Sequence, residues 1–285
     1  MNNFLARIYG GAILFLVCLI SIWTATWEGY SLIFFSVASS AICLAAWELE
    51  QMTKQVTELK GLPWSVLAAF LYLAAYFGYL RGMLPVSVSY LVLWSFLLLI
   101  CLYHFVSERR PLVAIALCLL PMGYLVLPLA TLFDIAYLPL ASPLDGRFWL
   151  AYLLLVVKSS DMAAYFVGKL WGRWQIAAYI SPKKTWEGAM GGIVAGPLVG
   201  WGWMAAVVQS HGGIIAPVSW PFLLALGMVL AIVAILGDLT ESLFKRDAGC
   251  KDSNSVLPGM GGLLDLLDSL VFAAPLLYIG LSLFM

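Results

Sequence analysis

Residues 220–237, WPFLLALGMVLAIVAILG, form a run of 18 residues without a charged side chain. A helix needs roughly 20 apolar residues to cross a bilayer core about 30 Å thick, so this run predicts a membrane-spanning helix. It ends directly before Asp238, the first residue of the most densely charged stretch of the chain. The run therefore indicates the class of the fold and the point where its chemistry begins.

The composition of the 285-residue chain supports the same class throughout, since 63% of its residues are hydrophobic and only 11% are charged. Soluble domains carry roughly 25% charged residues. Fifteen acidic and fifteen basic residues give a net charge of zero, which does not favour nucleic acid as a partner. We therefore expect an all-α, polytopic integral membrane protein whose partners include the lipid bilayer and no nucleic acid.

Nine candidate spans follow one another along the chain. They are Ile8–Trp27, Tyr30–Trp47, Pro63–Leu80, Met83–Val106, Pro111–Phe133, Phe148–Gly168, Ala189–Val208, Trp220–Gly237 and Leu263–Leu283. If they alternate across the bilayer, twelve Lys and Arg residues fall on one side and only Arg81 and Arg147 on the other. The positive-inside rule then places the N-terminus in the cytoplasm. We expect a five-helix membrane region over residues 1–147 and a four-helix catalytic membrane region over residues 148–285.

Charged residues gather in two segments on the predicted cytoplasmic side. The first segment begins inside the sixth span, where Lys158 and Asp161 are three residues apart and share a helix face with Tyr165. An ionised side chain at the bilayer centre costs about 2.5–3.5 kcal/mol on insertion scales. The pair either neutralises itself for helix packing or lines a polar cavity, and we favour the cavity.

The first segment continues into a basic loop that contains the run SPKKTWEG, starting at Ser181. Ser181 followed by Pro182 is typical of a helix N-cap with proline in the first turn. Lys184 and Thr185 would then lie at a helix N-terminus, whose N–H groups suit a phosphate. A basic membrane anchor is the alternative, but it would not require the Thr185 and Glu187 side chains or the glycines that follow.

The second segment leads from the span at residues 220–237 into the last span. Its first part repeats polar residues at helical spacings of three and four, namely Asp238, Glu241, Ser242 and Lys245. Asp265 and Asp268 repeat the pattern where the last span begins, and two like charges on one face there are unfavourable unless a cation lies between them. Carboxylates beside Lys and Arg suit Mg²⁺ that carries a polyphosphate. The alternative is a loop of solvated ion pairs.

The two segments together resemble the phosphatidate cytidylyltransferase family, also called CDP-diacylglycerol synthases. The family pattern is Ser-x-Phe/Leu-Lys-Arg, Lys-Asp, Pro-Gly-His-Gly-Gly and Asp-Arg-x-Asp. This chain reads SLFKR from Ser242, KD from Lys251, PGMGG from Pro258 and DLLD from Asp265. The pattern from Asp161 to Tyr165 and the run SPKKTWEG are also similar to that family.

Three family residues are replaced here: the usual His is Met260, the usual Arg is Leu266, and a usual small residue is Asn254. Met260 has no imidazole to donate to a phosphate, and Leu266 removes one cation. Phosphoryl transfer relies on positioning and charge neutralisation more than on a proton-transfer residue. The retained carboxylates and lysines therefore predict that the chain is active.

The resemblance implies transfer of CMP from CTP to phosphatidic acid, giving CDP-diacylglycerol and pyrophosphate in phospholipid biosynthesis. It implies Mg²⁺, room for a second cation, a homodimer, and a multi-pass protein of the cell (inner or plasma) membrane with its active site facing the cytoplasm. The expected catalytic residues are Asp238, Lys245, Arg246, Lys251, Asp252, Asp265 and Asp268. The expected Mg²⁺ ligands among them are Asp238, Asp252, Asp265 and Asp268. The expected substrate-binding residues are Asp161, Tyr165, Ser181, Lys184, Thr185, Glu187, Ser242, Gly261 and Gly262.

Two other functions stay open at the level of sequence. A CTP-dependent polyisoprenol or phytol kinase has a related membrane fold and would transfer the γ-phosphate of CTP. A transporter or lipid flippase would use Lys158, Asp161 and the late aspartates as an ion pathway. Many transporters show symmetry between their two halves, and the sequence shows none.

Overall fold

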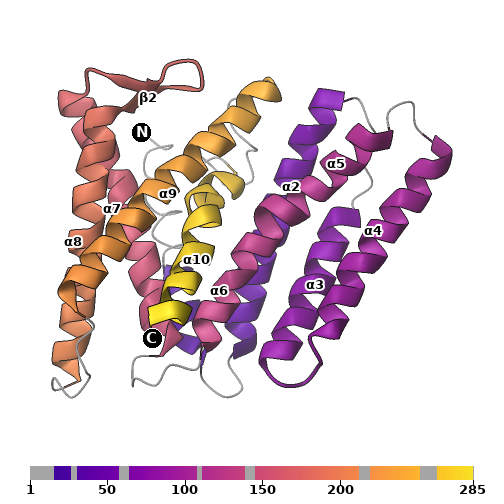
Figure 1. Cartoon of the computed structure of the whole chain (residues 1–285), viewed down its shortest axis with the longest axis horizontal. Coiled ribbons are helices and arrows are strands. Elements are labelled where there is room, and N and C mark those ends of the chain that lie inside the picture. Colours follow the sequence, from indigo (N-terminus) through magenta and orange to yellow (C-terminus); the bar gives the residue numbers. More distant parts are fainter. Residues whose placement is uncertain are drawn as a thin grey trace. The chain divides into compact units, whose positions relative to one another are not determined.

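The computed structural model describes residues 16–26, 31–57, 64–107, 111–138, 145–211, 219–250 and 262–284, and these residues are mostly helical (Figure 1). The helices are α2 (Ser31–Thr57), α3 (Trp64–Leu80), α4 (Ser87–Ser107), α5 (Pro111–Pro121), η1 (Met122–Val126), α6 (Leu127–Tyr137), α7 (Gly146–Trp171), α8 (Trp186–Ser210), α9 (Trp220–Asp247) and α10 (Leu264–Phe284). Residues 16–24 are helical as well.

The described helices include seven that are long and apolar enough to cross a membrane. They are Ser31–Lys54, Ser87–Phe105, Pro111–Tyr137, Gly146–Trp171, Trp186–Ser210, Trp220–Asp247 and Leu264–Leu283. Ser65–Leu80 is apolar but shorter. The expectation of a helical, multi-pass membrane protein is therefore confirmed. The count of nine stays a prediction, because the span Ile8–Trp27 lies partly outside the described residues.

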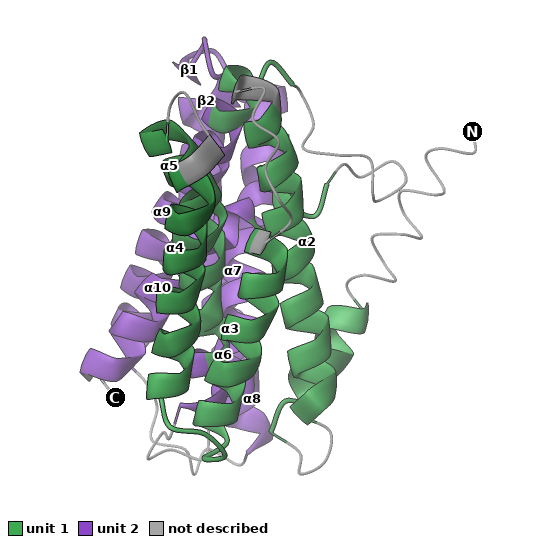
Figure 2. Cartoon of the chain, turned by 90° about the vertical axis from the view of Figure 1, so that its right-hand side faces the viewer, with its two compact units in different colours: residues 1–133, 244–267 green, residues 134–243, 268–285 purple. Residues whose placement is uncertain are grey.

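The chain divides into two compact units, drawn in different colours in Figure 2. One unit comprises residues 1–133 and 244–267, and the other comprises residues 134–243 and 268–285. Helices α6, α9 and α10 each contribute residues to both units. Some charged residues of α9 and α10 therefore belong to the first unit and others to the second. The polar cluster of each unit is described below.

Aromatic side chains from three helices pack together in the first unit. The rings of Phe35 and Phe77 stack with their centroids 4.7 Å apart, and Phe133 lies 5.9 Å from Phe35. Phe34 meets Phe133 edge to face at 5.5 Å. Such ring pairs add to the free energy gained by burial, so this cluster joins α2, α3 and α6.

The predicted span Pro111–Phe133 is not a uniform α-helix. It consists of α5, which ends at Pro121, then the π-helical turn η1, and then α6, which continues to Tyr137. Proline removes a backbone hydrogen bond and commonly accompanies such a change. Within the first unit, Tyr124 of this turn packs edge to face on Phe244 of α9, with centroids 5.0 Å apart.

Helices α7 and α8 of the second unit pack closely because α8 carries a glycine at every fourth position. These glycines are Gly188, Gly192, Gly196 and Gly200, and all four are buried. A Cβ atom at Gly196 would lie 2.8 Å from the carbonyl oxygen of Val156, and one at Gly192 would lie 2.7 Å from Oγ of Ser160. Small residues at this spacing let two membrane helices approach backbone to backbone.

Replacing Gly196 by Ala should therefore destabilise the second unit. The added methyl group cannot fit against the Val156 carbonyl, and such overpacking costs about 1–3 kcal/mol. We expect the thermal midpoint of the purified protein, followed by tryptophan fluorescence, to fall by several degrees. Gly202→Ala on the same helix is the matched control, because a Cβ there meets no atom within 4 Å. Equal midpoints for the two variants would contradict the packing argument.

Candidate active site

The basic loop after α7 folds into a small antiparallel hairpin in which β1 (Gln175–Ala177) pairs with β2 (Ser181–Thr185). The prediction that a helix begins at Ser181 is wrong, since α8 begins at Trp186. Its N-cap is Thr185, whose Oγ1 accepts a hydrogen bond from the Gly188 N–H at 3.2 Å. Pro182 fits in β2 because a two-stranded hairpin has only edge strands, where proline is tolerated.

Glu187 holds this hairpin to the start of α8. Its Oε2 accepts hydrogen bonds from the backbone N–H groups of Arg173 and Trp174, at 3.1 and 3.3 Å. Its negative charge in the first turn also suits the helix N-terminus. The structure thus gives Glu187, an expected substrate contact, an evident role in shaping the loop.

Lys184 connects the hairpin to α9. Its Nζ lies 2.7 Å from Oδ2 of Asp238, and the two side chains are 20% and 39% exposed. The two charged segments of the sequence therefore meet at this ion pair within the second unit. An ammonium group is thereby held beside a carboxylate that the sequence predicts to bind metal.

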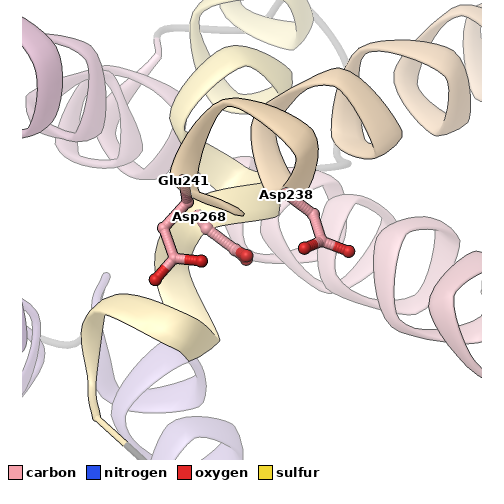
Figure 3. Close-up of side chains that lie close together, drawn as sticks. All are labelled: Asp238, Glu241 and Asp268. Atoms are coloured by element: carbon pink, nitrogen blue, oxygen red, sulfur yellow. The ribbon is translucent and has the colours of Figure 1, made fainter. Parts of the chain in front are cut away.

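Three carboxylates gather next to this ion pair, as Figure 3 shows: Asp238 and Glu241 from α9 and Asp268 from α10. Each offers one ligand atom, and these atoms all lie within 4.8 Å of one another. Glu241 is only 1% exposed and Asp268 only 5%. Like charges this close and this deeply buried repel one another unless positive charge lies among them. Oxygen ligands in this number suit a hard divalent cation such as Mg²⁺.

Gly237 lets α9 and α10 approach closely enough to form the cluster. A Cβ atom at this position would lie 2.3 Å from the carbonyl oxygen of Asp268, where no side chain fits. The next residue along α9 is Asp238, and Glu241 follows one turn later. The close contact at Gly237 therefore places both carboxylates beside Asp268.

The polar pair inside α7 belongs to the same region of the second unit. Nζ of Lys158 lies 3.4 Å from Oδ2 of Asp161 and donates to Oγ of Ser269 at 3.0 Å. Ser269 follows Asp268 and donates its backbone N–H to the Asp268 carboxylate. Lys158 and Asp161 therefore neutralise each other, as expected of a pair that serves helix packing. Their side chains are also 40% and 34% exposed, as expected of a pair that lines a cavity.

The first unit contains a second polar cluster, around Asp265. Oδ1 of Asp265 lies 2.6 Å from Nζ of Lys245, and its Oδ2 accepts the Gly262 N–H at 3.0 Å. The carboxylate of Glu48 accepts the N–H groups of Leu263 and Leu264, at 3.1 and 2.8 Å. The structure therefore shows Asp265, an expected Mg²⁺ ligand, in an ion pair with an expected phosphate-binding lysine.

The other expected site residues are less closely grouped. Tyr165 is 62% exposed, and Nζ of Lys169 lies 5.8 Å from the centre of its ring. Ser242 is half-buried on α9, and Arg246 is exposed near the end of that helix. The expected contacts at Lys251, Asp252 and Gly261 lie outside the described residues.

Sequence reasoning missed two carboxylates. The sequence predicts Glu241 on the same helix face as Asp238, three residues away, but not among the Mg²⁺ ligands, although that spacing is a usable signal. Glu48 directly follows the predicted span that ended at Trp47, whereas α2 continues to Thr57. A carboxylate inside a membrane helix is rare enough to point to function.

The chain is similar to known cytidylyltransferases. The model of a family described as the cytidylyltransferase family matches residues 5–284. The phosphatidate cytidylyltransferase of Chlamydia muridarum is 31% identical over 285 residues, which cover 97% of this chain and 92% of that protein. The phosphatidate cytidylyltransferase of Bacillus subtilis is 36% identical over 223 residues, covering 70% and 80%. That of Brucella suis is 46% identical over 133 residues, covering 46% and 45%.

The Gly237→Ala variant tests the link between helix packing and cation binding. The added methyl group should push α9 from α10 and separate the three carboxylates, because they come from both helices. A ligand that binds only the folded state raises its stability, so we expect Mg²⁺ to raise the thermal midpoint of the unaltered protein and not that of the variant. Gly202→Ala should respond to Mg²⁺ as the unaltered protein does. An unchanged Mg²⁺ response in Gly237→Ala would remove the cluster from consideration as the cation site.

Proposed function

This chain belongs to the cytidylyltransferase family, and we propose that it transfers CMP from CTP to phosphatidic acid. The products are CDP-diacylglycerol and pyrophosphate, so the chain is an enzyme, a nucleotidyltransferase of phospholipid biosynthesis. The match to phosphatidate cytidylyltransferases over nearly the whole chain carries this proposal. Apolar helices around a cluster of carboxylates and lysines fit an enzyme that joins a lipid to a nucleotide.

The reaction makes and breaks one bond each at the α-phosphorus of CTP. A phosphate oxygen of phosphatidic acid attacks this phosphorus, and the bond to the oxygen that bridges to the β-phosphorus breaks, so that pyrophosphate leaves with the bonding electrons. The attacking oxygen is already anionic and needs little help from a general base. The protein must instead bring two anions together and neutralise the charge of the leaving group.

The charge balance of the second unit supports one divalent cation. Four carboxylates and two ammonium groups lie in this region: Asp161, Asp238, Glu241, Asp268, Lys158 and Lys184. If all six are ionised, two negative charges are left over, which one Mg²⁺ would neutralise. We propose Asp238, Glu241 and Asp268 as its ligands, with Asp252 a further ligand predicted from sequence. When bound, Mg²⁺ would supply positive charge that stabilises the phosphate oxygens during the transfer.

Further positive charge for the phosphates would come from lysine and arginine side chains. Lys184 lies beside the proposed ligand Asp238, so its ammonium group can contact a phosphate of CTP. Lys245 and Arg246 on α9 are further phosphate contacts, as is Lys251. Asp265 would orient Lys245 through their ion pair rather than bind the metal, which changes the role that the sequence predicted for it.

Phosphatidic acid would enter beside α7. Lys158 and Asp161 lie inside a helix long and apolar enough to span a membrane and remain partly exposed, and Lys158 donates to Ser269, next to Asp268. We propose that this half-exposed pair meets the lipid headgroup, with Lys158 attracting its phosphate. Asp161 would line the pocket that the headgroup enters, and a second cation stays a prediction from the sequence.

The remaining assignments rest on charge distribution and on the family. The excess of Lys and Arg on one side supports a cytoplasmic N-terminus and an active site that faces the cytoplasm, where CTP is available. We propose the cell (inner or plasma) membrane as the location and a homodimer as the assembly.

Radiolabelled CTP distinguishes this function from that of a lipid kinase. With purified protein, phosphatidic acid and Mg²⁺, label from the α-phosphate should enter the lipid and label from the γ-phosphate should leave in pyrophosphate. Asp268→Asn should lower the rate by at least about 100-fold, because a proposed metal ligand is lost. Asp247→Asn, at the exposed end of α9, should keep the rate within about twofold. Entry of the γ-label into lipid would instead identify a kinase.

Lys184→Met tests the proposed contact with CTP. Hydrogen bonds to charged groups contribute about 1.5–3 kcal/mol, so the KM for CTP should rise about tenfold or more, with a smaller change in the KM for phosphatidic acid. Lys183→Met is the matched control, because Lys183 is exposed on the same strand. Equal effects of the two substitutions would show that only the overall positive charge of the hairpin matters.

A further inference from the structure

Glu48 is a fully buried carboxylate in the half of the chain that carries none of the family motifs. It lies on α2 with an exposed fraction of 0%, and the next residue, Leu49, is also buried. An ionised group in such surroundings costs several kcal/mol unless hydrogen bonds compensate for the lost water. Its retention therefore requires donors that hold it.

The donors are the first backbone N–H groups at the start of α10. Oε1 of Glu48 accepts the N–H of Leu263 at 3.1 Å, and Oε2 accepts the N–H of Leu264 at 2.8 Å. The first N–H groups of a helix have no partner within it and form its positive end. Glu48 therefore caps α10 from a position 215 residues earlier in the chain.

The capped turn carries Asp265, the next residue. The Asp265 carboxylate accepts the Gly262 N–H and pairs with Lys245 of α9. Three consecutive backbone N–H groups, from residue 262 to residue 264, are thus bound by two carboxylates. The direction of this turn determines where Asp265 points and therefore where it holds the ammonium group of Lys245.

We propose that Glu48 is a positioning residue for the transfer reaction. By binding the first turn of α10 with both carboxylate oxygens, it fixes the Asp265–Lys245 pair in the orientation that phosphate binding requires. This inference rests on the proposed function, because Lys245 is a phosphate contact there. It assigns a role in the reaction to the N-terminal half of the chain, for which the sequence motifs give none.

Glu50 is a natural control on the same helix. It is also buried, with an exposed fraction of 4%, but its carboxylate pairs with Lys54 at 3.0 Å and accepts a hydrogen bond from Ser65. Replacing either glutamate by Gln removes one negative charge from α2 and keeps the size of the side chain. The contacts of Glu48 reach the start of α10, whereas these contacts of Glu50 lie on α2 and at Ser65 of α3.

The experiment compares Glu48→Gln with Glu50→Gln in the purified full-length protein. A glutamine has one acceptor oxygen, so Glu48→Gln keeps one bond to α10 and places an NH₂ group against the other N–H. Amide hydrogen exchange at residues 262–264 should become about tenfold faster in Glu48→Gln, as expected for loss of one such bond, and stay unchanged in Glu50→Gln. In the same Glu48 variant, kcat should fall at least about tenfold, while the KM for phosphatidic acid changes less than about twofold.

Each outcome has a distinct meaning. Unchanged exchange in Glu48→Gln, or faster exchange with an unchanged kcat, overturns the proposal, and so does an equal loss of kcat in the two variants. If Glu48→Gln does not fold, Glu48→Asp replaces it, since it keeps the charge and both oxygens but is one methylene shorter; faster exchange with a partial loss of kcat is then expected, and unchanged values overturn the proposal. If the unaltered protein makes no CDP-diacylglycerol, the proposed function fails, and unchanged exchange in the variant would still reject the inference separately.

Discussion

Carboxylates in an apolar interior must be matched by positive charge or by N–H donors, and the polar architecture of both units follows from this constraint. In the second unit Lys184 pairs with Asp238 and Lys158 pairs with Asp161, and we propose a cation among the three clustered carboxylates. In the first unit Lys245 meets Asp265 and the start of α10 meets Glu48. Because each carboxylate and its partner come from different helices or different turns, tight helix packing is needed to hold them within contact distance.

Glycine supplies that packing where a membrane protein has little hydrophobic force to join its helices. The glycines of α8 bring α7 close, and Gly237 brings α9 against the Asp268 carbonyl. In each place a polar group lies beside the contact: Ser160 at α7 and the carboxylates at α9. The glycines that let the helices pack closely therefore also bring the polar groups of the candidate site together.

The sequence predicted the helical membrane fold and placed Asp238 and Asp268 among the residues of the candidate site, because long apolar runs and charges at helical spacing are local signals. The predictions from sequence are wrong or incomplete where contacts with residues far away in the sequence determine the local structure. Ser181 and Pro182 match a helix start in composition, but pairing with β1 makes them a strand and moves the cap to Thr185. Asp265 and Asp268 look equivalent in sequence, yet one pairs with Lys245 and the other joins the carboxylate cluster. Glu48 is understandable only once its partners on α10 are known.

Helix α9 runs without a break from its apolar part into its charged part, over 28 residues. At 1.5 Å per residue it is about 42 Å long, which exceeds a hydrocarbon core of about 30 Å. Asp238 lies 18 residues after Trp220, hence about 27 Å along the helix. This distance is close to the thickness of the hydrocarbon core, so a helix that begins at one face of the core would bring Asp238 to the other face. The length of the apolar part of α9 would then fix the depth of Asp238 relative to the phosphates of the lipid leaflet.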